Sequence, residues 1–253
     1  MEISDMPIYL ARMQRCLFDK MFFIDKLFEP VSFVVDYGCA DGSLIRALRS
    51  ITDDYQCVGY DISEEMIRLA RSGQPDVFFT ADWSEIGVPP GRTMLNLSSV
   101  IHEVYSYGTD ADIALFWDRV FQSGFRYIAV RDMMFSEKDD GLSDAKDAAV
   151  LREQKSLSGL LSDFESVCGP VTRKKNLVHF LLKYKYVENW DRELHENYFP
   201  LSLEEFTGRI PDRYRVTYLE HCPLPFLAWQ IRKDLGIELT VPTHLKLMLE
   251  LKQ

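Results

Sequence analysis

Side chains capable of acid–base or hydrogen-bonding chemistry stand where short apolar runs of this sequence end. Asp61 and Asp82 each close such a run, and His102 and Glu103 follow another one. A carboxylate can accept hydrogen bonds from hydroxyl or amine groups of a ligand. A histidine that titrates near neutrality can remove a proton, and a nearby carboxylate stabilises the imidazolium that forms. The pattern indicates a ligand site with an acid–base group at its border.

A bend of small residues follows the first apolar run. Gly38 and Gly42 flank Ala40 there, and a helical pattern over 43–51 begins directly afterwards. Such a bend presents backbone N–H groups and a helix N-terminus to a ligand. A dinucleotide fingerprint has the spacing Gly-x-Gly-x-x-Gly, whereas this stretch offers Asp-x-Gly-x-Ala-x-Gly. The alternative is that the glycines serve only a tight turn.

The first half of the chain alternates between apolar runs and helical patterns, which positions these residues. This rhythm specifies a parallel, doubly wound α/β sheet. The carboxyl ends of parallel strands meet at one edge, where ligands bind in open sheets. Strands are predicted over 33–39, 57–62, 77–80, 93–99 and 127–131.

The strand rhythm stops at residue 143. Apolar residues recur at intervals of three or four over 143–199, and Pro170 divides that stretch into two helical pieces. Because a crossover between parallel strands needs only one helix, we predict an inserted helical lobe. A sixth strand is predicted over 214–219. Leucines alternate with other residues over 245–252, as in an antiparallel strand with one partly exposed face.

Residues 35–42 resemble the first motif of the class I S-adenosylmethionine-dependent methyltransferases, an acidic residue followed by Gly-x-Gly-x-Gly, with Ala40 as the departure. The resemblance covers residues 31–135 and the two final strands. It implies a Rossmann-like domain, S-adenosylmethionine as cofactor, and Asp61 on the ribose hydroxyls. The cofactor-binding residues that it implies are Asp36, Gly38, Cys39, Ala40, Gly42, Asp61, Ile62, Met66, Asp82, Trp83, Leu97 and Ser98.

Two of these residues also have simpler interpretations. Asp61 can serve the N-terminus of the helix that follows it, where acidic residues are favourable. Trp83 can pack under the rim of the sheet, or it can supply an apolar wall for the adenine ring. The resemblance places Asp82 near the adenine amine.

The residues after the fourth predicted strand lie beside the sulfonium methyl group in that family. His102 and Glu103 are therefore the expected catalytic residues, similar to a His-Asp pair of plant small-molecule O-methyltransferases in which the histidine is the base. Adjacent residues of a helix do not share a face, so Glu103 need not orient His102. The alternative for His102 is a substrate-orienting or structural role. The expected substrate-binding residues are Ser99, Tyr105, Tyr107 and Asp132. For Asp132 an ion pair is the alternative, and for the tyrosines ordinary packing.

Composition limits the partners and the location. A formal net charge of −10 opposes indiscriminate binding to DNA, RNA or anionic membranes. No apolar run reaches the length of a membrane span, and the N-terminus does not resemble a signal peptide. Five cysteines without a Cys-x-x-Cys motif fit a reduced cytoplasmic protein, and they show no metal-ligand spacing with the histidines. We expect a cytoplasmic protein without a metal.

These observations favour a methyltransferase that acts on a small molecule, because the lobe is long enough to enclose a pocket. Two alternatives stay open. The stretch 173–185 combines lysines and arginine with nearby aromatic residues, which invites an RNA acceptor, although a solvated helix face explains it too. The chain can also be a cofactor-binding interaction protein without catalysis. The predicted domains are an N-terminal helical cap (1–30), a Rossmann-like domain (31–142 and 200–253) and an inserted helical lobe (143–199).

Overall fold

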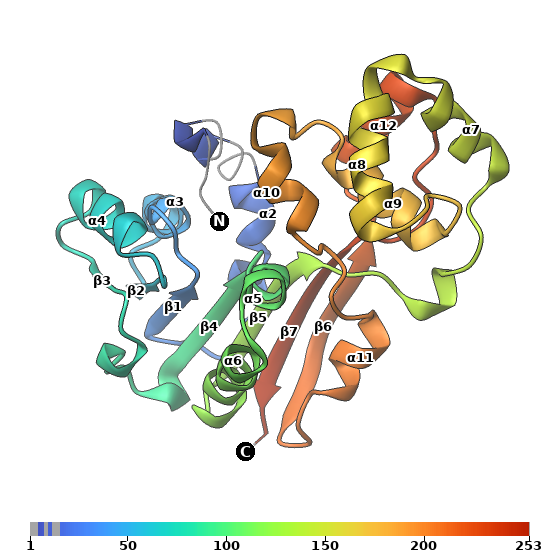
Figure 1. Ribbon diagram of the computed structural model, residues 1–253. Coiled ribbons are helices and arrows are strands. Elements are labelled where there is room, and N and C mark those ends of the chain that lie inside the picture. Colours follow the sequence, from blue (N-terminus) through green and yellow to red (C-terminus); the bar gives the residue numbers. More distant parts are fainter. Residues whose placement is uncertain (1–4, 8–9, 12–15, 253) are drawn as a thin grey trace.

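One seven-stranded sheet organises the molecule, in the order β3-β2-β1-β4-β5-β7-β6 (Figure 1). The computed structural model describes residues 5–7, 10–11 and 16–252. Strands β1 to β5 are parallel, and β7 runs antiparallel to both of its neighbours. The predicted mostly parallel sheet with an antiparallel C-terminal strand is confirmed. The strands are β1 (Phe33–Tyr37), β2 (Gln56–Tyr60), β3 (Phe78–Thr80), β4 (Thr93–Ser98), β5 (Tyr127–Met133), β6 (Tyr214–Cys222) and β7 (His244–Leu251).

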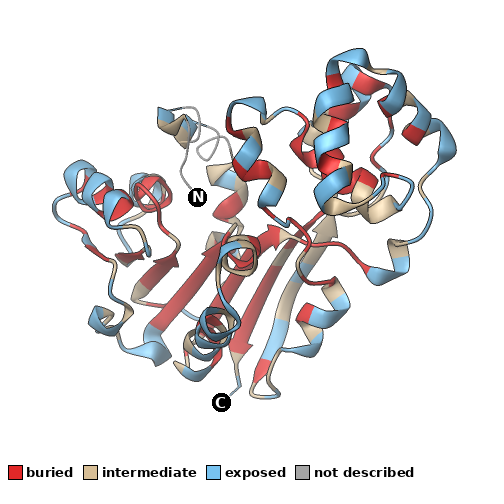
Figure 2. Ribbon diagram, viewed as in Figure 1, coloured by how far each residue is buried: buried red, intermediate tan, exposed pale blue. Residues whose placement is uncertain are grey.

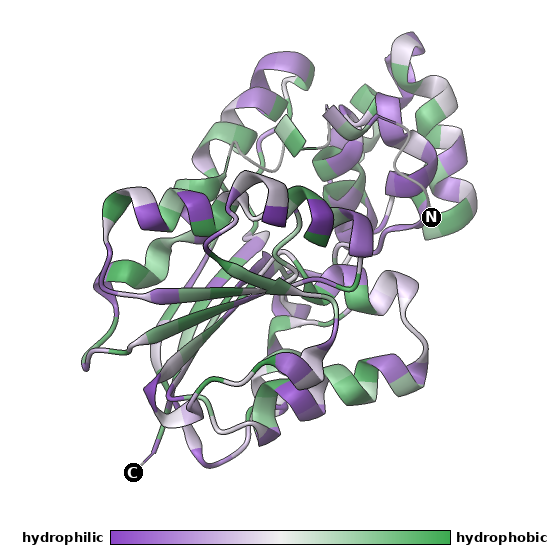
Figure 3. Ribbon diagram, turned by 90° about the vertical axis from the view of Figure 1, so that its left-hand side faces the viewer, coloured by the Kyte–Doolittle hydropathy of each residue, from purple (hydrophilic) through white to green (hydrophobic). Residues whose placement is uncertain are grey.

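Helices cover both faces of the sheet, because successive strand residues point to opposite sides. Val34 packs on one face with Leu44 and Leu48 of α3, whereas Val35 packs on the other with Phe116 of α6. The central strands are buried and hydrophobic along most of their length (Figures 2 and 3). The helices beside the sheet are α2 (Leu17–Lys20), α3 (Ser43–Ile51), α4 (Glu64–Gly73), α5 (Ile101–Tyr107), α6 (Asp110–Gln122) and α11 (Leu203–Gly208).

A second hydrophobic core lies outside the sheet, in the helices at the upper right of Figure 1. The predicted helical lobe is confirmed. Ile231 and Leu235 of α12, which joins β6 to β7, are buried in the same core as Leu177 and Leu181. The boundaries 143–199 remain a prediction. The helices of this core and its surroundings are α7 (Ala145–Glu153), α8 (Ser158–Cys168), α9 (Lys174–Lys183), α10 (Trp190–His195) and α12 (Pro225–Leu235).

The C-terminal strand differs from its expectation. Met248 and Glu250, on the face expected to be partly exposed, are buried. Met248 joins the core formed with Tyr127 and Ala129, and Glu250 pairs with Arg126 and Arg215. These two residues are buried because β7 lies between β5 and β6, whereas Lys246 is partly exposed and Lys252 is exposed, so the expected face is open only toward its ends.

The N-terminal segment is described in part, and residues 1–4, 8–9 and 12–15 of the predicted cap lie outside the described residues. In the described part, α2 and the 3-10 turn η1 (Phe22–Asp25) pack on β1 and β4 through Met21 and Phe23. Within the described residues, none of the helices combines the length and the hydrophobicity that crossing a membrane requires.

Candidate cofactor and acceptor site

The bend between β1 and α3 has a left-handed backbone at three positions. The φ angles are 77° at Gly38, 45° at Ala40 and 73° at Gly42. A Cβ atom added at Gly42 would lie 2.8 Å from the ring of Phe79, so this glycine is required by sterics as well as by its φ angle. Ala40 tolerates its strained conformation while its N–H donates to Asp61 Oδ2 at 2.9 Å. The hydrogen bond from Ala40 to Asp61, which directly follows β2, therefore fixes the conformation of the bend.

Asp61 connects two loops at the carboxyl edge of the sheet. Its second oxygen, Oδ1, accepts from the N–H of Ser63 at 2.9 Å, and Ser63 caps α4. Burial raises the pKa of Asp61, although its hydrogen bonds from Ser63 and Ala40 act in the opposite direction. Each carboxylate oxygen has further accepting capacity for ligand hydroxyls. The adjacent Ile62 is 85% exposed and offers an apolar surface beside that carboxylate.

Asp82 and Trp83 lie at the end of β3 with different surroundings. Asp82 is exposed, and its Oδ1 accepts from the N–H of Ser84 at 2.8 Å. The Trp83 ring lies 5.1 Å from the ring of Tyr37 and 5.2 Å from that of Tyr60, centroid to centroid. The contacts of this ring are those of a packed aromatic cluster under the rim of the sheet. Its contact with a cofactor stays a prediction.

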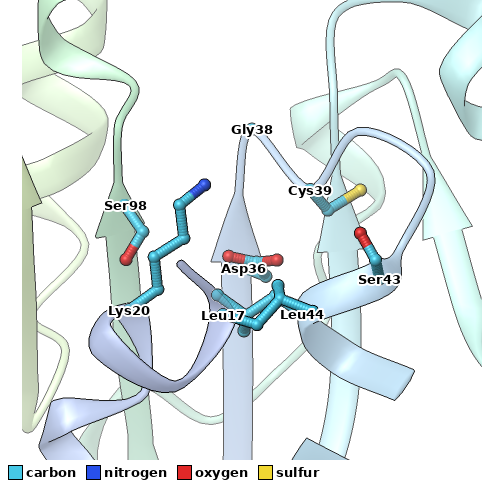
Figure 4. Close-up of a pocket in the computed structure, with 8 residues that line it drawn as sticks. All are labelled: Leu17, Lys20, Asp36, Gly38, Cys39, Ser43, Leu44 and Ser98. Carbon is cyan, nitrogen blue, oxygen red and sulfur yellow. The ribbon is translucent and has the colours of Figure 1, made fainter. Parts of the chain in front are cut away.

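A small pocket opens beside the bend (Figure 4). Asp36 lies in it with 3% exposure and accepts a hydrogen bond from Asn96 Nδ2 at 2.7 Å. Burial raises the pKa of Asp36 to about 6, against the opposing influence of Asn96 and of the charge on Lys20. Burial also raises the pKa of the Cys39 thiol, so it stays protonated. The pocket is lined by Leu17, Lys20, Asp36, Gly38, Cys39, Ser43, Leu44 and Ser98.

His102, in α5 directly after β4, is held between two carboxylates. Its Nδ1 lies 2.6 Å from Asp132 Oδ1, and its Nε2 lies 3.3 Å from Glu196 Oε1. Burial by itself would lower the pKa of His102, but the two carboxylates outweigh it and raise the pKa to about 10. The side chain is therefore an imidazolium at neutral pH, with both nitrogens engaged. This arrangement supports the positioning role of His102 over that of a base.

Glu103 has a more open environment than His102. Its side chain is 35% exposed, and its Oε1 lies 3.0 Å from Arg192 Nη2. Burial raises the pKa of Glu103, and so does the charge of Glu196. The charges of His102 and Arg192 act on the pKa of Glu103 in the opposite direction.

The four predicted substrate-binding residues do not converge. The Tyr107 hydroxyl donates to the carbonyl of Arg192 at 3.3 Å, and its ring centroid lies 4.9 Å from the guanidinium carbon of Arg192, which pairs with Glu103. Tyr105 instead accepts from Trp117 Nε1 at 2.9 Å. Asp132 is fully buried, where it accepts from the N–H of Ile101 as well as contacting His102. Ser99, with a φ angle of 60°, accepts from Arg131 Nη1 at 3.1 Å.

A buried polar cluster in the lobe, which sequence reasoning missed, fixes Glu196. Lys183 is fully buried, and its ammonium donates to the backbone carbonyls of Glu193 and Glu196. The Tyr198 hydroxyl donates to the carboxylate of Glu193, whose pKa is raised to about 7 by burial and by Glu196. Helical spacing gave no signal for this cluster, because its members converge only when the lobe folds.

Side-chain atoms of His102, Glu103 and Glu196 approach within 4.8 Å of one another, as metal ligands do. The guanidinium of Arg192 lies between two of these side chains. Arg192 Nη2 lies 3.0 Å from Glu103 Oε1 and 3.8 Å from Glu196 Oε1. The guanidinium therefore neutralises these carboxylates in the role that a metal ion would take.

The comparisons agree with this architecture. No protein-family model and no curated protein matches the sequence. Among solved structures, the plantazolicin methyltransferase BamL, in complex with a triazolic desmethylPZN analog and SAH (S-adenosylhomocysteine), has a TM-score of 0.53 at 13% identity, over 94% of this chain and 85% of its own. The geranyl diphosphate C-methyltransferase of Streptomyces coelicolor A3(2), in complex with Mg²⁺, geranyl diphosphate and S-adenosyl-L-homocysteine, has a TM-score of 0.51 at 10% identity, over 95% and 81%.

The fold of this chain is that of the class I S-adenosylmethionine-dependent methyltransferases. Identities of 13% and 10% establish the fold alone. A shared fold does not define an activity, which depends on the residues at the carboxyl edge.

Proposed function

We propose that this protein is an S-adenosylmethionine-dependent methyltransferase with a small-molecule acceptor. The observation that carries the proposal is the row of carboxylates on successive strands. Asp36, Asp61 and Asp82 lie at the carboxyl ends of β1, β2 and β3, beside the left-handed bend. Bound S-adenosylmethionine supplies a methyl group already activated on a sulfonium, so the chain has mainly to hold the acceptor in line with it.

The site fits the parts of that cofactor. Asp61 would accept hydrogen bonds from the ribose hydroxyls, the exposed Ile62 would contact the adenine, and Asp82 would accept from its amine. The bend formed by Gly38, Cys39, Ala40 and Gly42 would let the cofactor approach the backbone, and the pocket lined by Asp36 and Ser98 would hold its amino-acid end. Met66 and Leu97 are buried, so they would pack beneath the residues that contact the cofactor.

On the acceptor side we assign the base to Glu103. Its carboxylate is partly exposed, its pKa is raised by burial, and Arg192 and Tyr107 flank it. His102 acts as a positioning residue, since Asp132 and Glu196 occupy both of its nitrogens. An acceptor hydroxyl or amine would lose its proton to Glu103 as the methyl group is transferred.

The electrostatics favour a small acceptor over RNA. Asp61 and the exposed Asp82 would repel phosphates at this edge. In the basic stretch 173–185, Arg173 pairs with Asp140, Lys185 pairs with Asp234, and Lys183 is buried. The two solved neighbours were crystallised with a desmethylPZN analog and with geranyl diphosphate, neither of which is a nucleic acid.

Two experiments test the proposed function. Calorimetric titration of the intact protein with S-adenosylmethionine and with S-adenosylhomocysteine should show one site for each. Absence of binding would overturn the cofactor assignment. Incubation with methyl-labelled cofactor and fractionated cell extract should then place label in small metabolites. Label in RNA would favour the first alternative, and bound cofactor without any methyl transfer would favour the interaction protein.

The Glu103→Gln substitution should separate catalysis from binding. Turnover on the labelled metabolite fraction should fall about 10²- to 10⁴-fold, because general-base catalysis typically contributes that much. Cofactor affinity should stay within about 3-fold, because Glu103 is not part of the proposed cofactor site. Glu153→Gln, an exposed change at the end of α7, is the matched control.

The pH profile gives a second readout for Glu103. A base must be ionised, so turnover should fall as pH drops through the pKa of Glu103. That pKa lies above the ordinary carboxyl value of 4.5 because of burial. The acidic limb should disappear in Glu103→Gln. Retention of more than half of the turnover, with an unchanged pH profile, would remove Glu103 from the mechanism.

A further inference from the structure

Lys20 is a lysine buried at the carboxyl edge of the sheet. Its side chain extends from α2 toward the bend and is only 6% exposed (Figure 4). Lysines are almost never buried to this extent unless their charge is matched. The same pocket contains the carboxylate of Asp36 and the hydroxyl of Ser98. A cation and an anion therefore face one small cavity.

The two charges do not contact each other directly. The Lys20 ammonium is near enough to lower the pKa of Asp36, yet among the described residues no hydrogen bond or ion pair joins the two side chains. Asp36 instead accepts from Asn96, whose Oδ1 accepts from the Ser98 hydroxyl at 3.0 Å. Buried opposite charges held apart leave both with unused hydrogen-bonding capacity.

The position of Lys20 is set by its neighbour in α2. The Asp19 carboxylate lies 2.9 Å from Arg131 Nε on β5 and 2.5 Å from Lys246 Nζ on β7. Burial would raise the pKa of Asp19, but these two cations lower it, so the carboxylate is firmly ionised. Leu17 packs into the hydrophobic core beside β1. The helix is thereby anchored across the strand ends, and Lys20 is placed in the pocket before any ligand arrives.

We propose that Lys20 binds the α-carboxylate of the methionyl end of S-adenosylmethionine, while Asp36 and Ser98 receive its α-ammonium group. This inference rests on the proposed function. An α-amino acid carries opposite charges on one carbon, and a zwitterion inserted between Lys20 and Asp36 gives each buried charge an opposite partner. Charge-assisted hydrogen bonds are strong where water is excluded.

A consequence is that α2 does more than cover the sheet. It supplies one wall of the cofactor site, and through Lys20 it discriminates for ligands that carry an amino-acid carboxylate. Adenosine derivatives that lack this group would leave the Lys20 ammonium buried without its partner, which costs binding free energy. Lys20 is thus a specificity-determining residue for the cofactor.

The test compares two cofactors that differ in one group. Decarboxylated S-adenosylmethionine keeps the adenosine, the sulfonium and the amino group but lacks the carboxylate. Titrated calorimetrically into the intact protein, it should bind about 10- to 100-fold more weakly than S-adenosylmethionine, as the loss of a charged hydrogen bond predicts. This measurement needs no variant, so it does not depend on whether a substitution folds.

Lys20→Met then assigns the effect to the residue. The variant should bind S-adenosylmethionine about 10- to 100-fold more weakly and the decarboxylated cofactor within about 3-fold of the intact protein. Lys20→Arg, which keeps the charge, should bind S-adenosylmethionine more tightly than Lys20→Met. Lys26→Met is the matched control, because Lys26 pairs with Asp25 outside the pocket and should leave both affinities unchanged.

Three outcomes would overturn the assignment. Equal affinity of the intact protein for the two cofactors would show that the carboxylate is not recognised. Equal weakening of both by Lys20→Met would mean that Lys20 only supports the shape of the site. An unchanged affinity of Lys20→Met for S-adenosylmethionine would exclude any contact. If the intact protein bound neither cofactor, the proposed function itself would fail, which the first titration distinguishes.

Discussion

Asp61→Ala is expected to weaken the binding of S-adenosylmethionine about 10²- to 10⁴-fold. Two ribose hydroxyls donating to one carboxylate form two charge-assisted hydrogen bonds, each contributing about 1.5 to 3 kcal/mol. The substitution also removes the acceptor of the Ala40 N–H, so the left-handed bend loses the contact that holds it. Recognition of the ribose and the shape of the bend are lost together.

Calorimetry with the intact protein and three variants measures this effect. Asp61→Asn keeps a neutral oxygen acceptor and should give an intermediate loss. Asp53→Ala removes the same charge from an exposed position before β2 and should leave the affinity unchanged. Thermal melting controls for folding. An affinity of Asp61→Ala within about 3-fold of the intact protein would mean that Asp61 serves only the N-terminus of α4.

Asp132→Ala is expected to lower the free energy of unfolding by about 3 to 5 kcal/mol, as removal of one partner of a buried ion pair does. The His102 imidazolium would keep only Glu196 as a counter-charge. The backbone N–H groups of Ile101 and Met133, which donate to Asp132 at 2.7 and 2.8 Å, would also lose their acceptor. The variant therefore disrupts α5, β5 and the contact with the lobe at the same time.

Chemical denaturation at several pH values checks this prediction and its electrostatic cause. The pKa of His102 is raised to about 10 in the folded protein, above its ordinary value of 6.5. Its contribution to stability is therefore complete below about pH 6.5 and is lost as pH rises toward 10. This loss should be shallower in Asp132→Ala, because the folded pKa of His102 falls when its first partner is removed.

The control for Asp132 is Asp118→Ala, on the exposed side of α6, which should change the free energy of unfolding by less than about 0.5 kcal/mol. A loss below about 1 kcal/mol for Asp132→Ala, with a pH dependence like that of the intact protein, would contradict the buried imidazolium. His102 would then be free to act as the base that the sequence suggested.

The proposed acceptor side is assembled from two regions that are distant in the sequence. His102 and Glu103 come from α5, whereas Arg192 belongs to α10 and Glu196 directly follows that helix. The Lys183 ammonium holds the backbone that carries Glu196. The lobe therefore contributes charged groups that contact His102 and Glu103. Substitutions within the polar cluster of the lobe should therefore alter turnover and leave cofactor affinity unchanged, because these residues lie outside the proposed cofactor site.

Local sequence patterns determined the sheet, the bend after β1 and the row of carboxylates at the carboxyl edge. Short apolar runs alternating with helical patterns gave the parallel strands, since burial on both faces needs continuous apolar residues. The small residues at 38, 40 and 42 predicted the bend, and the order of Asp36, Asp61 and Asp82 along the chain placed them at one edge. Each of these features depends on residues a few positions apart, which a sequence displays directly.

The tertiary structure alone decided the partners of the buried charges. His102 meets Asp132 at a separation of 30 residues and Glu196 farther on, so neither contact appears in any spacing. In the sequence, Lys20 is only one residue of the predicted N-terminal helical cap. Its side chain reaches the pocket because Asp19 anchors α2 on β5 and β7. The physical reason is that pKa values and free hydrogen-bonding capacity depend on desolvation and on charges from distant segments, and both exist only after the chain has packed.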